Sequence, residues 1–480
     1  MPTEYSNYVD GKWTESRTGN VFETSNPAHP GETVGVYQQS SEADAEAAVE
    51  AAAAAAPEWA NTPGPARGKI LTETASILSD RADELTETLV REEGKTKPEA
   101  SGEVQRAIDI FAYYGAKAAD VGGTVKAPSG RDSRLYTVNE PVGVAALITP
   151  WNYPIAIPAW KLAPALAAGN AVVTKPASLA PAVAIGIVEA LESAGLPDGV
   201  VNLVTGPGSS VGSTFVTHEA VDAVSFTGST KVGNTVYGQA APDQKRVQLE
   251  LGGKNPAIVM PSADVDEAVE IAATGAFGVT GQACTATSRA IVHEDVYDEF
   301  VEGVVSYGEG LSIGDGLEGA DMGPHVSESE LEGTLDYVDA GRREGATLET
   351  GGERADAGEG YFVEPTIFSD VSSEMRIAQE EIFGPVLAVI PVSDFDEAVA
   401  VANDVEYGLS ASIVTNDHRE ANRFVDEIEA GVVKINEKTT GLELHVPFGG
   451  MKASSSETYR EQGDAGLDFF TISKTVYDNY

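Results

Sequence analysis

Cys284 is the only cysteine of the chain, and it lies in a polar, glycine-punctuated segment, residues 277–289. A cysteine acts as a nucleophile when its pKa is lowered or when a base lies nearby, and backbone amides at such a turn supply part of the first condition. A lone cysteine is more often a small buried hydrophobic residue. The segment by itself therefore leaves both interpretations open.

Glu250 ends the apolar run Val247–Leu249 and precedes Leu251-Gly252-Gly253-Lys254. A carboxylate at the tip of a parallel strand projects into the crevice where such sheets bind ligands. Its place suits a general base, and the alternative is a surface glutamate before a turn. Because the chain also contains Cys284, we favour the role of general base for Glu250.

Two glycine loops, 206–212 and 227–233, follow predicted strands. Neither has the spacing of the dinucleotide fingerprint, and no Gly-Lys-Ser/Thr sequence predicts a P-loop. The second loop still places Gly228 and Ser229 before a helix start, where amide groups and the helix dipole favour a pyrophosphate. The alternative interpretation is that both loops are ordinary turns.

The elements that must position these residues alternate between strand and helix. Amphipathic helices are predicted first, at Glu42–Ala55, Arg67–Glu93 and Glu103–Tyr114, followed by strands Arg134–Val138 and Gly143–Ile148. Strands Ala171–Thr174, Val200–Val204, Ala223–Phe226 and Val247–Glu250 then alternate with helices Ala182–Ser193, Val211–Thr217 and Val232–Ala240. This alternation predicts a doubly wound parallel sheet.

A second alternation begins after Gly253. Its predicted strands are Ala257–Val259, Arg289–Val292, Val386–Pro391 and Ala411–Val414, and its helices are Val265–Thr274, Val296–Gly308 and Asp396–Val401. The chain is therefore expected to have two α/β domains with a boundary near Glu250–Gly253.

The net charge of −44, from 75 acidic and 31 basic residues, is spread along the chain and argues against a nucleic-acid partner. Strong screening relieves such self-repulsion, so we interpret the charge as an adaptation to a salt-rich cytosol, with an ordinary acidic protein as the alternative. One cysteine excludes an internal disulfide, and six scattered histidines predict no metal site. No signal peptide or membrane span is visible, so a cytoplasmic location is expected.

Motifs in register along nearly the whole chain resemble the aldehyde dehydrogenase superfamily. They are Thr149–Pro154, Lys175-Pro176, Phe226–Gly233, Glu250–Asn255, Gly281–Cys284, Glu380–Pro385 and Pro447–Gly450. The resemblance implies an α/β fold with a Rossmann-type cofactor domain (1–122 and 142–250), an α/β catalytic domain (251–466) and a small β flap for oligomerisation (123–141 and 467–480).

The resemblance also implies the catalytic roles. Cys284 attacks the aldehyde, while the amide of Asn152 and the backbone N–H of Cys284 form an oxyanion hole. Glu250 activates the water that hydrolyses the thioester, and Glu461 assists in proton relay.

The implied cofactor is NADP, with NAD as the other possibility. The family's cofactor positions correspond here to Pro150, Trp151, Lys175, Ser178, Gly228, Ser229, Gly233, Leu251, Glu381 and Phe383. Many NAD-preferring members carry a glutamate at the position of Ser178, and that carboxylate would repel a 2′-phosphate. Serine beside Lys175 therefore favours NADP, although Ser178 could simply cap the next helix.

Residues 152–161 and 439–447 resemble the α-ketoglutaric semialdehyde (2,5-dioxopentanoate) dehydrogenase group. Succinic semialdehyde dehydrogenases usually carry arginines at the positions of Trp160 and Gly278. The absence of these arginines argues against succinic semialdehyde as the substrate. The closest group often has an arginine before the nucleophile, but this chain has Ala283. Arg106 is a candidate replacement for holding the distal carboxylate, or it is a solvated helix residue.

The remaining alternatives are a broad-specificity aldehyde dehydrogenase, a CoA-acylating enzyme and a non-catalytic, crystallin-like protein. Retention of Glu250 favours hydrolysis, and the presence of Asn152, Glu250 and Cys284 together favours catalysis. The resemblance also implies a homodimer or homotetramer formed through the flap segments 123–140 and 468–480, in which a partner covers an otherwise exposed strand edge.

Overall fold

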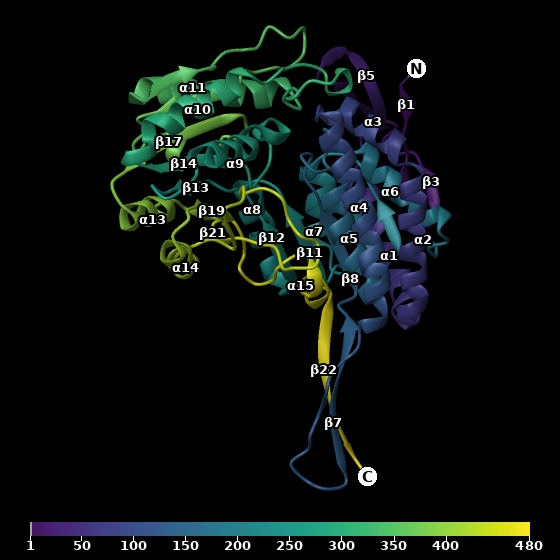
Figure 1. Ribbon diagram of the computed structural model, residues 1–480. Helices are drawn as coiled ribbons and strands as arrows, with labels where there is room; N and C mark the ends of the chain where they lie inside the picture. Colours follow the sequence, from purple (N-terminus) through teal and green to yellow (C-terminus); the bar gives the residue numbers. More distant parts are fainter. Residues whose placement is uncertain (1) are drawn as a thin grey trace.

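The computed structural model describes residues 2–480, and two seven-stranded sheets dominate it (Figure 1). The first sheet has the order β12-β11-β8-β9-β10-β2-β3. Its five parallel strands are β8 (Val144–Ile148), β9 (Ala171–Lys175), β10 (Val201–Leu203), β11 (Ala223–Thr227) and β12 (Arg246–Glu250), and the antiparallel strands β2 (Asn7–Val9) and β3 (Lys12–Thr14) extend one edge. The doubly wound sheet predicted from the sequence is therefore present.

The strand order of this sheet reverses between β8 and β11. The chain proceeds from β8 through β9 to β10 and then returns to the other side of β8 for β11 and β12. Strand β8 ends at Ile148 and β11 at Thr227, so the segments that begin at Thr149 and Gly228 leave the sheet side by side. Open α/β sheets bind ligands at such a reversal.

Helices cover both faces of the first sheet because neighbouring strand residues point to opposite faces. Val144, Ala146 and Ile148 pack on one face, while Ala145 and Leu147 pack on the other. The first face carries α1 (Glu42–Asn61), α7 (Ser213–Thr217) and α8 (Thr230–Ala240), and the second carries α2 (Gly64–Asp80), α3 (Ala82–Glu93), α4 (Lys97–Lys117), α5 (Ala156–Ala168) and α6 (Ala182–Ser193).

The second sheet has the order β15-β16-β17-β14-β13-β19-β20. Its strands are β13 (Asn255–Val259), β14 (Thr287–His293), β16 (Thr366–Ser369), β17 (Val386–Val392), β19 (Ser410–Val414) and β20 (Val432–Ile435), all parallel, with β15 (Thr347–Thr350) antiparallel at one edge. One face packs against α9 (Val265–Phe277) and α10 (Tyr297–Glu309), and the other against α11 (Glu328–Glu344), α12 (Arg376–Gln379), α13 (Phe395–Asn403) and α14 (His418–Glu427).

A third, antiparallel sheet in the order β22-β7-β6 projects away from the body of the molecule (Figure 1). It comprises β6 (Val125–Lys126), β7 (Ser133–Pro141) and β22 (Thr471–Asn479), which follows α15 (Gly463–Phe469). The smaller sheets contain β1 (Thr3–Glu4), β4 (Val21–Asn26) and β5 (His29–Gln38), and β18 (Tyr407–Gly408) with β21 (Met451–Lys452). The division into a cofactor domain, a catalytic domain and a flap at the sequence-predicted boundaries remains our proposal.

Three helix predictions differ from the structure. The single helix expected over Arg67–Glu93 is wrong, because Arg81 leaves helical geometry (φ −104°, ψ 10°) and separates α2 from α3. The first helix, predicted to end at Ala55, continues through Pro57 to Asn61. The helix predicted at Val211–Thr217 is preceded by a wider helical turn at Gly208–Gly212, which takes up its first residues. Helix α5 was not predicted, because it is buried on every side and therefore lacks a polar face. No helix within residues 2–480 is long and apolar enough to cross a membrane.

Candidate active site

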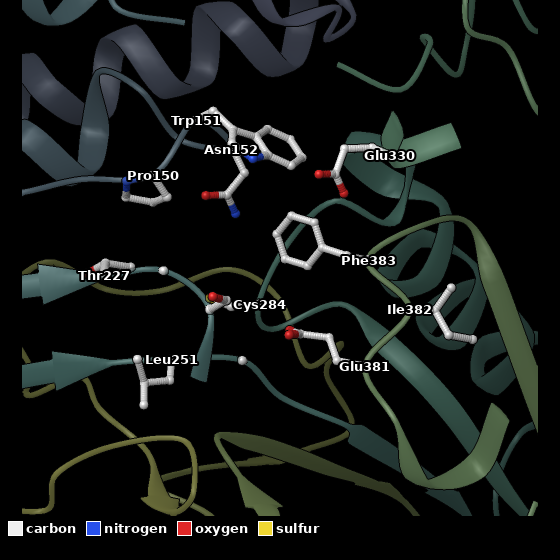
Figure 2. A pocket seen from close by; sticks show the side chains of 13 residues that line it. Pro150, Trp151, Asn152, Thr227, Leu251, Cys284, Glu330, Glu381, Ile382 and Phe383 are labelled. Carbon is white, nitrogen blue, oxygen red and sulfur yellow. The ribbon is translucent and has the colours of Figure 1, made fainter. Parts of the chain in front are cut away.

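Two cavities meet at Cys284. The first has a volume of about 300 Å³ and lies at the reversal point of the first sheet, facing the second sheet. It is lined by Pro150, Trp151, Asn152, Thr227, Gly228, Ser229, Leu251, Gly252, Cys284, Glu330, Glu381, Ile382 and Phe383 (Figure 2). The second has a volume of about 410 Å³ and lies between α4, α5 and the residues around Cys284. A thiol shared by two cavities can contact a different molecule from each side.

The turn before Cys284 holds a strained backbone. After α9 ends at Phe277, Val279 and Thr280 adopt left-handed φ values of 53° and 56°, which are unfavourable for residues with a Cβ. Asn255 anchors the following segment, because its side-chain amide donates to the carbonyl of Cys284 at 2.8 Å and to that of Ala286 at 2.9 Å. The strand β13 therefore fixes the backbone at the thiol.

The pKa of the Cys284 thiol is raised above its ordinary value. Burial of the residue is the main cause, and the negative charges of Glu381, Glu250 and Glu461 add to it. A backbone hydrogen bond does lower this pKa, as expected for the turn, but burial outweighs it. The resting residue is a thiol and needs a base before it can attack.

Asn152 lies in the loop after β8 and lines the first cavity. Its side-chain amide nitrogen donates to the carbonyl of Gln282 at 3.0 Å, two residues before Cys284. Figure 2 shows the Asn152 amide pointing toward the space beside Cys284. An N–H donor at this place suits an oxyanion that forms on a carbon bonded to the thiol, and its role remains a prediction.

A buried ionic cluster holds the loop that carries Asn152. The ammonium of Lys95 donates to the backbone carbonyl of Asn152, pairs with Glu103 at 2.6 Å and lies 4.1 Å from the ring centre of Tyr153. Glu103 in turn accepts from the backbone N–H groups of Ile155 and Ala156, at 3.0 and 3.1 Å. Lys95, just before α4, and Glu103, within α4, are therefore bonded to the middle and the end of this loop.

Glu250 sits at the carboxyl end of β12 and is 2% exposed. Its carboxylate accepts from the Gly450 N–H and from the Ser455 hydroxyl, each at 3.3 Å, and it lines neither cavity. Burial and the negative charge of Glu461 raise its pKa well above the ordinary value, while Lys161 and Arg460 oppose the rise. The side chain must turn toward Cys284 to act there as a base.

Glu461 forms a buried ion pair with Lys161 of α5, and the Lys161 ammonium also donates to the Ser225 hydroxyl at 2.7 Å. Glu461 accepts from Ser225 at 3.4 Å, and one of its oxygens has no partner within residues 2–480. The pair lies close enough to Glu250 to influence its charge. This is the arrangement that a proton relay needs, and the relay remains a prediction.

Seven of the ten predicted cofactor residues line the first cavity: Pro150, Trp151, Gly228, Ser229, Leu251, Glu381 and Phe383. Glu381 accepts from the Gly253 N–H at 3.0 Å, and burial raises its pKa to about 7. A Cβ on Gly252 would lie 2.1 Å from the Glu381 carboxylate, so only glycine allows this close approach. The rings of Trp151 and Phe383 meet edge to face at 5.4 Å.

Lys175, Ser178 and Gly233 lie outside that cavity lining. Lys175 ends β9, donates to the carbonyl of Pro176 at 2.8 Å, and has a pKa lowered to about 8 by burial. Ser178 donates to the carbonyl of Gly206 at 3.3 Å and does not cap α6, whose N-cap is Pro181. A Cβ on Gly233 would lie 2.4 Å from Leu251, so glycine lets α8 pack against that residue.

The first cavity has features that a dinucleotide needs. Ser229 caps α8, with its hydroxyl accepting from the Val232 N–H at 3.4 Å, so the positive end of that helix faces the cavity. The buried hydroxyl of Thr227 lines the same cavity and has no hydrogen-bond partner in the described chain. Glu381 supplies acceptors near the thiol for hydroxyl groups, so the residues fit an NAD(P)-type ligand.

Sequence reasoning missed several residues of the site. Glu103 and Lys161 lie on helices, and Lys95 lies in the link between α3 and α4. Only Lys161, the lone lysine in the apolar run of α5, carried a signal, because such a charge is costly to bury. Thr227, Gly252, Glu330 and Ile382 complete the first cavity. Within residues 2–480 no cluster of three or more His, Cys, Asp or Glu residues is suited to a metal ion.

Comparison with known proteins gives matches along nearly the whole chain. The profile of the aldehyde dehydrogenase family matches residues 13–476. The chain is 67% identical to alpha-ketoglutarate semialdehyde dehydrogenase of Haloferax volcanii, with 100% of both chains covered, and 45% identical to 2,5-dioxopentanoate dehydrogenase of Saccharolobus solfataricus, with 98% of both covered. The crystal structure of betaine aldehyde dehydrogenase from Staphylococcus aureus in complex with NAD+ is 35% identical and superimposes with a TM-score of 0.96, covering 99% of this chain and 94% of that chain.

Proposed function

The chain belongs to the aldehyde dehydrogenase family, and from this premise we propose that it oxidises α-ketoglutaric semialdehyde to 2-oxoglutarate. The observation that carries the chemistry is the thiol of Cys284 between two cavities, one fitting a dinucleotide and the other an aldehyde. The names of the similar proteins from Haloferax volcanii and Saccharolobus solfataricus support the substrate. The chain is an NAD(P)-dependent oxidoreductase that turns an aldehyde into an acid.

In the proposed mechanism the sulfur of Cys284 bonds to the aldehyde carbon, and the thiol proton passes to a base. The oxygen becomes an oxyanion that accepts from the Asn152 amide and the Cys284 N–H, each donor contributing about 3 kcal/mol in comparable sites. An NAD(P) bound in the first cavity, beside Ser229, Glu381 and Phe383, would supply the hydride acceptor, and loss of hydride from this carbon would leave a thioester on Cys284. Glu250 then takes a proton from water, the hydroxide attacks the thioester, and the carbon–sulfur bond breaks to release the acid.

A panel of aldehydes, run with both cofactors in high salt, tests this proposal. We expect the highest kcat/KM with α-ketoglutaric semialdehyde, complete loss of activity in Cys284→Ala, and loss of about 100-fold or more in kcat for Asn152→Ala. Cys284→Ala that still oxidises aldehydes would overturn the mechanism. A higher kcat/KM for succinic semialdehyde or for unbranched alkyl aldehydes would overturn the substrate.

We further propose that NADP is the preferred cofactor. Ser178 carries no carboxylate to repel a 2′-phosphate, and Lys175 stands three residues before it at the end of β9. The comparison of kcat/KM for NADP and NAD decides this, and Ser178→Glu should shift the ratio toward NAD. A clear NAD preference of the wild type contradicts the proposal.

The flap supports a homodimer or homotetramer as the working form. Its strands expose Val125, Ile472 and Tyr477, with Val125 83% exposed, and an apolar strand surface of this kind is usually covered by a partner. Light scattering after gel filtration should give a mass of two or four chains, and a monomer would contradict this. A free thiol that must stay reduced is consistent with the cytoplasm as the proposed location.

A further inference from the structure

The second cavity carries two positively charged side chains without ion-pair partners. Arg106 of α4 and Lys438, which follows β20, both line it, and neither forms an ion pair within the described chain. The two cations line this cavity in a chain that has 75 acidic and only 31 basic residues. An unpaired, half-buried arginine beside a cavity is a binding group for an anion.

Arg106 is held in one orientation. Its guanidinium donates to the side-chain oxygen of Gln462 at 2.8 Å, and Gln462 is only 1% exposed at the start of α15. This single bond uses one N–H and leaves others of the planar fork free. The helix α4 and the buried glutamine therefore present the guanidinium as a preorganised donor.

The acidic residues near the cavity do not neutralise Arg106. Glu99 accepts from the Thr96 and Val279 N–H groups, and Glu103 is bonded to Lys95 and to the first residues of α5. Glu443 and Asp109 act on Arg106 through their charge, but neither pairs with it directly. The positive charge of Arg106 thus remains available to a ligand.

The residues nearest the thiol supply no alternative cation. Ala283, Trp160 and Gly278 line the cavity on the side of the thiol, and none of them carries a charge. We propose that Arg106, oriented by Gln462, binds the carboxylate at the far end of the aldehyde substrate, and that Lys438 adds a second positive charge. This inference rests on the proposed function, because it assigns the anchor for an aldehyde that is also an acid.

The walls between the two ends suit the carbon chain of such a molecule. Ile157, Trp160 and Phe448 line the cavity with apolar surface, and the rings of Trp160 and Phe448 lie 6.1 Å apart. The aldehyde end then lies at Cys284 and the carboxylate end at the guanidinium. A charged group bound at a fixed distance from the thiol selects the length of the substrate as well as its charge.

The test compares α-ketoglutaric semialdehyde with pentanal, a neutral aldehyde of the same chain length. Arg106→Met should lower kcat/KM for the semialdehyde about 100-fold, mainly through KM, and leave pentanal nearly unchanged. Lys438→Met should lower kcat/KM for the semialdehyde by a smaller factor. Arg106→Lys should retain part of the kcat/KM that Arg106→Met loses. Lys117→Met is the matched control, since Lys117 lies on the same helix, pairs with Asp464 at 2.7 Å and lies outside the cavity.

Unchanged melting temperatures establish that the variants are folded. A wild type that prefers the semialdehyde, together with an Arg106→Met variant that keeps this preference, overturns the inference and leaves the proposed function standing. Equal loss with both aldehydes overturns it as well, because it indicates a structural role. A wild type that does not prefer the semialdehyde overturns the proposed substrate and, with it, the anchor.

Discussion

At the scale of single residues, burial and the charges around Cys284 determine when its thiol reacts. Burial and three carboxylates raise its pKa, so the thiolate forms only at alkaline pH in the absence of ligands. Because Cys284 is the only cysteine, the mass of the alkylated chain reports this residue alone. Alkylation by iodoacetamide should be slow at pH 7 and accelerate as the pH rises beyond 9, the ordinary pKa of a thiol.

The variant Glu381→Gln removes the charge that raises the thiol pKa most and should increase alkylation at pH 7 several-fold. Glu380→Gln is the control, because Glu380 pairs with Arg376 at 2.8 Å and lies outside the cavity lining. Rapid alkylation that has already levelled off at pH 6 would contradict the raised pKa.

Glu250 gives a second pH dependence. Its raised pKa means that the carboxyl loses its proton only above the usual carboxylate range, so the base is absent in acid and present at higher pH. If Glu250 drives hydrolysis of the thioester, kcat should fall on acidification earlier than an ordinary carboxylate would require. Glu250→Gln should retain one rapid burst of NAD(P)H per site and lose about 100-fold or more of the steady-state rate.

Stopped-flow absorbance at the NAD(P)H band separates the burst from the steady state. Ser456→Ala is a nearby control, since Ser456 contacts the N–H of Leu249 at 3.4 Å rather than the Glu250 carboxylate. A Glu250→Gln variant with normal turnover would remove Glu250 from the mechanism.

At the scale of elements, the site combines contacts that the sequence predicts with contacts that it does not. Glu250 and Gly228 could be placed in advance, because each follows a short apolar run and parallel strands bring their carboxyl ends to one edge. The bonds from Lys95 to Asn152 and from Glu103 to the start of α5 could not, because they join segments 57 and 52 residues apart through helix packing. Local periodicity carries no information about such pairs.

The Lys95–Glu103 pair gives a prediction for positioning. Replacing Lys95 alone would leave Glu103 buried without its partner, so the double variant Lys95→Met/Glu103→Gln keeps an acceptor for α5 without the charges. We expect kcat to fall about tenfold with little change in KM, because the Asn152 loop loses an anchor while the cavities persist. In an Asn152→Ala background the same two substitutions should lower kcat little further.

Steady-state kinetics on the four proteins complete this double-mutant cycle. Additive losses would mean that Lys95 and Glu103 act independently of Asn152. Equal effects on KM and kcat would indicate general loosening of the first domain, contrary to a positioning role.

At the scale of the whole molecule, the sequence predicts the two α/β alternations because each buried strand is a short apolar run between turn residues. It does not predict that strands β2 and β3, at residues 7–14, join the first sheet beside β10, nearly 200 residues later. Nor does it predict that residues 448–461 return to cover Glu250, as the bridge between Glu250 and Ser455 requires. The active site is thus complete only when three distant parts of the chain have packed together.

The net charge of the whole chain is the reason why salt should stabilise this protein. A net charge of −44 opposes compaction, and ions shorten the range of repulsion from about 10 Å at 0.1 M to about 3 Å at 1 M. The buried pairs Lys95–Glu103 and Lys161–Glu461 are shielded from these ions, so salt should remove surface repulsion without loosening the site. The melting temperature should therefore rise by several degrees between 0.1 and 2 M KCl. Sucrose at matched osmolality is excluded from the protein surface without screening charge, so it should raise the melting temperature less. A melting temperature that stays constant or falls in KCl would contradict the adaptation to salt.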